Sequence, residues 1–193
     1  MRVKSSILYI GGEDVRMRIP MLKKMIKKGY SVGAVGCNDS NAFKDQEITY
    51  FDYYLNRSIS PLKDIKSIHQ LRNIFQREKP NLIHLFDTKP GVLTPKVAKI
   101  SGVKFVVRTV TGMGFVFSSN SIFVKALRPF YRLMQKRAIR YTDSVIFQNA
   151  GDKEDEKFLK IRYEEDKNLT YFAKEQHRIF PNWEYGYIIW NKI

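Results

Sequence analysis

Cysteine is almost absent from this sequence, since Cys37 is the only one among 193 residues. A single cysteine excludes an internal disulfide and a cysteine-rich zinc site, and it suits a reducing compartment. His69 and His177 have no partners at metal-ligand spacing, so no metal site is predicted. No apolar run approaches the roughly 20 residues of a membrane-spanning helix, and the N-terminal segment lacks the features of a signal peptide. These absences predict a cytoplasmic protein.

Acidic residues are also scarce. The chain has 34 lysines and arginines against 19 acidic residues, which gives a net charge of +15. Such an excess points to nucleic acid, an anionic membrane surface or a phosphate-bearing ligand. No homeodomain, RRM, KH or zinc-finger pattern is present, which disfavours nucleic acid as the partner.

Short apolar runs alternate with helical patterns over the first 150 residues. The runs predict strands over 6–10, 31–35, 48–54, 82–86, 105–110 and 144–148. The intervening patterns predict helices over 15–28, 61–78, 90–102 and 121–141. Near-continuous apolar strands separated by helices are typical of a doubly wound parallel sheet, so we expect one Rossmann-like α/β domain. Pro20 lies inside the first helical pattern, so that helix either begins there or kinks.

The alternation of strand and helix patterns ends near residue 160, and we assign residues 1–160 to the α/β domain. Residues 161–193 form an aromatic-rich tail that carries both tryptophans, Trp183 and Trp190. The tail has no strand–loop–helix unit. It could wrap the domain or pair with another chain.

Ligands of parallel sheets bind at the carboxyl ends of the strands. Gly11 and Gly12 follow the first strand, where glycines let a ligand approach the backbone and a helix N-terminus favours negative charge. Glu13 and Asp14 come next. The alternative is a tight turn with acidic capping residues, since neither a G-x-G-x-x-G fingerprint nor a P-loop is present.

The fourth strand ends in a second group of candidates. His84 is predicted to be a satisfied core histidine. At the strand's exit, Asp87 could accept a sugar hydroxyl and Lys89 could pair with a phosphate. The alternative is that Asp87 or Thr88 only caps the next helix.

The fifth strand leads into a loop with two glycines around a methionine, Thr111-Gly112-Met113-Gly114. Such a loop could close over a ligand, or it could be an ordinary surface loop. Its apolar character favours contact with something.

A strongly basic helix follows that loop, with no acidic residue between positions 121 and 141. On a helical wheel the basic residues fall within an arc of about 120°; they are Lys125, Arg128, Arg132, Lys136 and Arg140. The opposite arc is apolar and holds Phe123, Leu127, Phe130, Met134, Ala138 and Tyr141. The basic face is either simply solvated or lies on an anionic membrane.

Together these residues resemble the N-terminal half of family-4 glycosyltransferases of the GT-B architecture, of the kind that builds bacterial capsule, O-antigen or lipopolysaccharide. The resemblance covers about residues 5–160. Its motifs are GGEDVRMRIPMLKKMIKKGYSV, YYLNRSISPLKDIKSIHQLRNIFQREKPNLIHLFDTKPG, VVRTVTGMGFVFSS and DSVIFQNAGDKEDEKFL.

The resemblance implies a transferase that moves a sugar from a nucleotide-sugar to a lipid-linked or polysaccharide acceptor. It implies that this half holds the acceptor and lies on the inner face of the cell membrane. The implied catalytic residues are Glu13, Asp87 and Thr111, the last standing where many members carry a histidine. The implied acceptor-binding residues are Gly11, Gly12, Lys89, Gly112, Met113 and Gly114.

The chain has about half the family's length, so the resemblance also predicts that the donor-binding domain lies elsewhere. A separate chain would supply it, or the gene is truncated, and the chain alone would not turn over. No cofactor is expected besides the nucleotide-sugar co-substrate. The alternatives are a non-catalytic, membrane-associated acceptor-binding subunit or remnant, and a nucleotide- or nucleic-acid-binding α/β protein.

Overall fold

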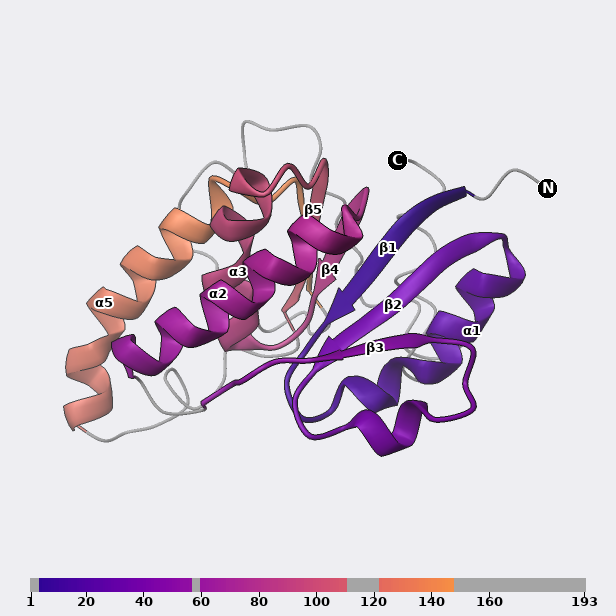
Figure 1. Cartoon of the computed structure of the whole chain (residues 1–193). Helices are drawn as coiled ribbons and strands as arrows, with labels where there is room; N and C mark the ends of the chain where they lie inside the picture. Colours follow the sequence, from indigo (N-terminus) through magenta and orange to yellow (C-terminus); the bar gives the residue numbers. More distant parts are fainter. Residues whose placement is uncertain (1–3, 57–59, 111–121, 148–193) are drawn as a thin grey trace, which may run out of the picture.

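A parallel β-sheet lies at the centre of the protein (Figure 1). The structure is a computed structural model, and it describes residues 4–56, 60–110 and 122–147. The strands of these segments are β1 (Lys4–Ile10), β2 (Tyr30–Gly36), β3 (Thr49–Asp52), β4 (Leu82–Leu85), β5 (Phe105–Val110) and β6 (Ser144–Phe147). They form one sheet in the order β3-β2-β1-β4-β5-β6, with every pair parallel. The predicted doubly wound α/β fold is therefore confirmed.

Helices cover both faces of the sheet (Figure 1). They are α1 (Ile19–Lys27), α2 (Pro61–Glu78), α3 (Thr88–Ile100) and α5 (Ile122–Ile139), with short 3-10 helices η1 (Val15–Arg18) and η2 (Ser40–Phe43). α1 packs on one face, while α2, α3 and α5 gather on the other. None of the helices described is both long and apolar enough to cross a bilayer.

Successive side chains of β1 point to opposite faces of the sheet, so the core has two parts. Ile7 and Tyr9 pack on the α1 side against Leu22, whereas Leu8 and Ile10 pack on the α2 side. Both sets are buried because helices lie on each face, which explains why the strand reads as a continuous apolar run. Each fully buried aliphatic side chain contributes about 1.5–3 kcal/mol to the free energy of unfolding.

Proline sets the start of α1. Pro20 stands in the first turn of α1, where its missing N–H has no helical partner to lose. The preceding residues form η1 instead, so the prediction that the helix begins near Pro20 is confirmed and the kink is not needed.

One apolar residue of α2 lies in solvent. Ile65 stands at helical spacing from Leu71 and Phe75, so the sequence predicts all three in the core, but the Ile65 side chain is 51% exposed while the other two are buried. The first turns of α2 extend past the packed part of the sheet, so only the later turns reach the core.

Candidate functional site at the switch point of the sheet

The strand order reverses between β1 and β4, and this is the point where open α/β sheets bind ligands. β1 and β4 are neighbours, so the chain segments that leave their carboxyl ends meet. The backbone N–H of Phe86 donates to the Ile10 carbonyl at 2.8 Å and extends this pairing by one residue. The predicted candidates after the first and fourth strands are therefore brought together.

Gly11 is held from two sides. Its N–H donates to the Val35 carbonyl at 3.0 Å, and its own carbonyl accepts the Tyr53 hydroxyl at 2.9 Å. Tyr53 is buried, and burial raises the pKa of its phenol well above the ordinary value. No sequence signal indicates this role for Tyr53, because its partner lies 42 positions away.

Both backbone polar groups of Gly12 are also hydrogen-bonded within the protein. Its N–H donates to Asp87 Oδ2 at 2.8 Å, and its carbonyl accepts the Cys37 N–H at 3.2 Å. A Cβ at Gly12 would stand 3.3 Å from that carboxylate oxygen and 3.2 Å from Leu55 Cδ2. The glycine turn thus provides close approach between segments, while its own N–H groups are used within the protein.

Asp87 is the central polar side chain of the site. It stands at the N-cap of α3, but its side chain makes no capping bond and turns to Gly12 instead. Its backbone has φ 67°, a left-handed conformation that costs a non-glycine residue energy and that clusters at functional sites. The hydrogen bond of its side chain to Gly12 uses Oδ2, and its backbone carbonyl accepts the Gly91 N–H at 3.1 Å.

Lys89 lies in the first turn of α3 but reaches towards α2. Its Nζ pairs with Asp64 Oδ1 at 2.6 Å and donates to the Asn56 carbonyl at 2.5 Å. Both charged side chains are mostly buried, so the lysine charge is balanced inside the protein. Glu13 is exposed beside the glycine turn. Thr111, Gly112, Met113 and Gly114 lie outside the described residues.

Arg18, at the end of η1, is a cation at this site that the sequence analysis missed. Its guanidinium carbon lies 4.1 Å from the centroid of the Phe86 ring, a cation–π contact. Burial lowers the pKa of Arg18, while the charges of Asp87 and Asp14 oppose that shift. Nothing in the segment DVRMRIP distinguishes Arg18 from Arg16, because only the 3-10 turn decides which of them faces the sheet.

An aromatic column lies beneath Arg18. Phe86 stacks on His84 with ring centroids 4.3 Å apart, and Tyr9 lies next to both rings. His84 is buried and its Nε2 is 2.7 Å from the Thr109 hydroxyl, so its predicted place in the core is confirmed. Burial, helped by the Arg18 charge, lowers the pKa of His84 to about 3. The His84 imidazole therefore stays neutral at physiological pH, and the stacked rings pack beneath the Arg18 guanidinium.

Comparison with known proteins shows the family to which this chain belongs. A family model described as glycosyl transferase 4-like matches residues 6–149. The chain belongs to this family. A curated relative, the UDP-Gal:alpha-D-GlcNAc-diphosphoundecaprenol alpha-1,3-galactosyltransferase of Escherichia coli, is 31% identical over 110 residues, which are 57% of this chain and 27% of the relative.

Solved structures of low identity share the fold. The chain matches Acinetobacter baumannii MurG with TM-score 0.55 and 12% identity over 91% of this chain and 47% of MurG. It matches the S. aureus MnaA–UDP structure with TM-score 0.61 and 16% identity over 87% of this chain and 44% of that one. It matches the lipopolysaccharide outer core galactosyltransferase WaaB with TM-score 0.56 and 14% identity, over 86% of this chain and 44% of WaaB. The chain thus spans about a quarter of the curated relative and less than half of these solved chains.

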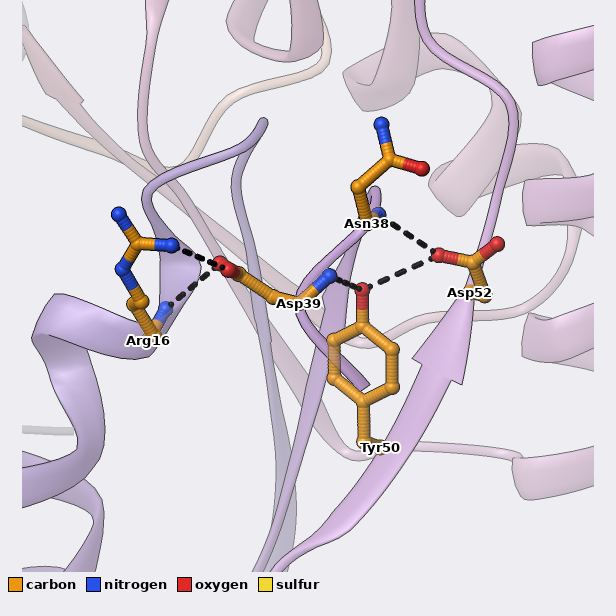
Figure 2. Close-up of polar contacts among 5 residues, drawn as sticks. All are labelled: Arg16, Asn38, Asp39, Tyr50 and Asp52. Atoms are coloured by element: carbon orange, nitrogen blue, oxygen red, sulfur yellow. Dashed lines mark hydrogen bonds and ion pairs between the residues drawn. The ribbon is translucent and has the colours of Figure 1, made fainter. Parts of the chain in front are cut away.

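A second polar network of this glycosyl transferase 4-like domain lies where β2 and β3 end (Figure 2). Asp39 is buried, and its carboxylate accepts both the backbone N–H and the guanidinium of Arg16, each at 3.1 Å. The Tyr50 hydroxyl accepts the Asp39 N–H at 3.2 Å and donates to Asp52 Oδ1 at 3.1 Å. Asn38 donates its N–H to the same Asp52 oxygen at 3.1 Å, while its carboxamide points away (Figure 2). These bonds fix η1 against the ends of β2 and β3.

On the other side of the site, a buried arginine joins β5 to α5. Arg108 donates to Gln135 Oε1 at 2.6 Å, and the Gln135 amide donates to the Tyr131 hydroxyl at 2.7 Å. Gly91 makes room for this side chain, because a Cβ there would meet the guanidinium at 3.2 Å. Burial raises the pKa of Tyr131.

The polar pair Tyr131 and Gln135 turns α5 relative to the predicted orientation by roughly 60°. As a result Phe130, expected on the apolar inner face, is 53% exposed, whereas Ala138 is buried as expected. Of the predicted basic residues, Lys136 and Arg140 are exposed and Arg128 is half-buried. The side chains of Lys125 and Arg132 lie outside the described part of the chain.

The outward face of α5 is consequently mixed in character. It presents three apolar side chains and three cations within an arc of about 120°. These residues are Ile122, Phe130, Leu133, Lys136, Arg137 and Arg140. No group of three metal-ligating side chains occurs among the described residues of this domain.

Proposed function

We propose that this chain is the acceptor-binding side of a glycosyltransferase that moves a sugar from a nucleotide-sugar to a lipid-linked acceptor. Membership of the family supports the reaction class. The curated relative is named as transferring galactose from UDP-galactose to a GlcNAc-diphosphoundecaprenol, which supports an acceptor of that chemical class. Synthesis of a cell-surface glycan such as O-antigen or capsule is the corresponding role.

One observation carries the assignment of the site. The Gly12 N–H and Asp87 Oδ2 meet at 2.8 Å where the strand order reverses, and this bond fixes the Asp87 carboxylate at the carboxyl ends of β1 and β4. A carboxylate fixed in this way can accept a hydrogen bond from the attacking sugar hydroxyl and orient it. Glu13, exposed next to Gly12 in the chain, is a second acidic candidate, and Thr111 with residues 112–114 remain candidates outside the described residues.

The mixed face of α5 supports a peripheral position on the inner face of the cell membrane. Apolar side chains beside cations are the composition of helices that lie in an anionic interface. On this proposal the membrane face and the acceptor site belong to the same half, so a lipid-linked acceptor reaches Asp87 without leaving the bilayer.

Transfer of radiolabelled galactose from UDP-galactose to farnesyl-diphosphate-linked GlcNAc tests the function. Because the chain spans less than half of its solved relatives, the assay uses the chain alone and with the C-terminal half of the E. coli relative added. We expect transfer with the added half, and Asp87→Asn should lower kcat by about a hundredfold or more while the fold is kept. Lys23→Gln, on the outer side of α1, is the control.

Two results would count against this function. Binding of the acceptor without transfer under every combination would reduce the chain to a non-catalytic acceptor-binding subunit. Absence of acceptor binding would contradict the proposal altogether.

A further inference from the structure

We propose that Asn38 and Asp52 bind two neighbouring hydroxyl groups of a sugar ring at the carboxyl ends of β2 and β3. The site lies beside the switch point, separate from Asp87, and the inference rests on the proposed function. The ligand class is an uncharged ring with adjacent hydroxyls. Such a ring is either a further sugar of the acceptor or the ribose of a nucleotide.

The usual sugar-binding residue of this topology is used within the protein. In dinucleotide-binding domains with this strand order, an acidic residue after the second strand binds the ribose hydroxyls. Asp39 has that place in the chain, but it is buried, and its two carboxylate oxygens accept the backbone N–H and the guanidinium of Arg16. A sugar at these strand ends therefore has to be bound by other groups. Asn38 and Asp52, on either side of this network, are both exposed.

The Asp52 carboxylate is held in a defined orientation. Its Oδ1 accepts the Tyr50 hydroxyl and the Asn38 N–H, each at 3.1 Å (Figure 2). The Tyr50 oxygen accepts the Asp39 N–H, and burial raises the pKa of this phenol far above its ordinary value, so the hydroxyl remains a donor to Asp52. Within the described segments Oδ2 makes no hydrogen bond. Asp52 thus presents one oriented acceptor oxygen.

Asn38 places a carboxamide next to that oxygen. Its backbone has φ 61°, in the left-handed region that asparagine adopts more readily than most residues. The bond from its N–H to Asp52 keeps the two residues together, while its side chain points away from the network (Figure 2). The carboxamide makes no hydrogen bond to the part of the chain that the structure describes. It offers both a donor and an acceptor.

These groups suit hydroxyls better than an anion or a metal ion. The Arg16 charge is balanced by the buried Asp39, so Asp52 leaves the site negative and repels phosphate. No set of three metal-ligating side chains is found among residues 4–56, 60–110 and 122–147. A hydroxyl both donates and accepts, so one can donate to Asp52 Oδ2 while its neighbour bonds to the Asn38 carboxamide.

The position of the site predicts a ligand with more than one ring. Asn38 directly follows the residue whose N–H binds the Gly12 carbonyl, so the site borders the glycine turn. Asp52 ends β3 and Asp87 follows β4, and these strands are three spacings apart in the sheet, roughly 14 Å. A ligand that contacts both carboxylates therefore needs at least two rings.

Calorimetric titration of the full chain tests the assignment with three probes. They are farnesyl-diphosphate-linked GlcNAc, the corresponding farnesyl-diphosphate-linked GlcNAc disaccharide, and UDP. Asp52→Asn keeps an inner acceptor for Tyr50 but puts an amide donor in place of the outer oxygen. Asn38→Gly keeps the left-handed backbone and its N–H but removes the carboxamide. Each should weaken binding of the disaccharide acceptor by about ten- to thirtyfold and leave the single-sugar acceptor unchanged.

Asp45→Asn is the matched control, because it removes the same charge from another exposed residue with φ 61°. Melting temperatures check that all variants remain folded. If only UDP binding falls, the hydroxyls belong to the ribose, and the inference stands with the nucleotide as the source. If both variants bind the disaccharide acceptor and UDP as the wild type does, or the wild type binds neither probe, the inference is overturned. Binding of the single-sugar acceptor would then leave the proposed function intact, whereas its absence would contradict that function as well.

Discussion

Single residues at the switch point illustrate how burial tunes chemistry. His84 lies under the Arg18–Phe86 contact, completely enclosed, and burial with the nearby cation lowers its pKa to about 3. In the unfolded chain the same imidazole has a pKa near 6.5. Between these two values the unfolded state binds one more proton than the folded state. The free energy of unfolding therefore decreases as the pH falls through this window.

This linkage gives a prediction for stability. Between pH 7 and pH 5 the His84 contribution should lower the free energy of unfolding by about 2 kcal/mol. Urea unfolding at a series of pH values measures it. His84→Gln should flatten the profile, and His69→Gln, at an exposed position on α2, is the matched control substitution. Equal slopes for the wild type and His84→Gln would contradict the assignment.

The sequence identified several site residues by position but not by contact. Gly12 and Asp87 could be predicted to meet, because both follow strands that end at the same sheet edge. That Asp87 would bond to Gly12 could not be predicted, since it depends on a left-handed backbone at position 87. Lys89 was predicted to face a phosphate, and its ion pair with Asp64 depends on how α2 and α3 pack.

At the scale of elements, glycine lets β2 and η1 approach each other. A Cβ at Gly36 would lie 2.4 Å from Val15 Cγ1 and 3.1 Å from the Gly12 carbonyl. Real Cβ atoms do not come so close, so a larger residue forces the start of η1 away from the sheet. Since η1 carries Arg18, its distance from the sheet also matters for the site.

Substitution of these two residues tests that packing. Gly36→Ala should lower the free energy of unfolding by about 1–3 kcal/mol through overpacking. In a Val15→Ala background the same substitution should cost less, because the methyl group that it meets has been removed. A double-mutant cycle followed by urea unfolding measures the coupling. Additive effects of the two substitutions would show that the Cβ at position 36 and the Val15 side chain do not compete for the same volume.

Helix boundaries followed from local signals, but helix orientation did not. Pro61 and the sequence around Glu78 define α2 as predicted, because caps and breakers act within one turn. The rotation of α5 depends on Arg108, a buried charge on another element that attracts Gln135. A hydrophobic wheel treats Tyr131 and Gln135 as ordinary surface positions. The wheel does not show that Arg108 on β5 donates a hydrogen bond to Gln135, or that Gln135 donates to Tyr131.

At the scale of the whole molecule, the parallel sheet could be predicted because each strand reads as an apolar run between helices. The order of the strands, and with it the neighbouring ends of β1 and β4, was not predicted and comes from the structure. The network of Asp39 and Tyr50 could not be foreseen, since it joins the ends of three segments through single hydrogen bonds (Figure 2). It is nevertheless what holds η1, and therefore Arg18, at the edge where the proposed acceptor enters.

The outward face of α5 gives a prediction that tests the proposed binding of the molecule to a membrane. Its apolar part, Phe130 and Leu133, is 53% and 46% exposed, and Lys136 and Arg137 follow on the same face. Serine at both apolar positions should weaken binding to vesicles of phosphatidylglycerol and phosphatidylcholine by about tenfold or more, because their transfer into the interface is lost. Glutamine at both cations should weaken it by about fivefold for each charge and remove most of its salt sensitivity.

Vesicle flotation measures both effects. The control substitution lies on another helix, away from the outward face of α5. Ile100→Ser removes a more exposed apolar side chain, 65% exposed, from the C-terminal end of α3 and should leave flotation unchanged. If Phe130→Ser with Leu133→Ser floats as the wild type does, the face of α5 is solvated and the acceptor is delivered by another route. If only the charge changes matter, the contact is electrostatic and the helix rests on the headgroups without entering them.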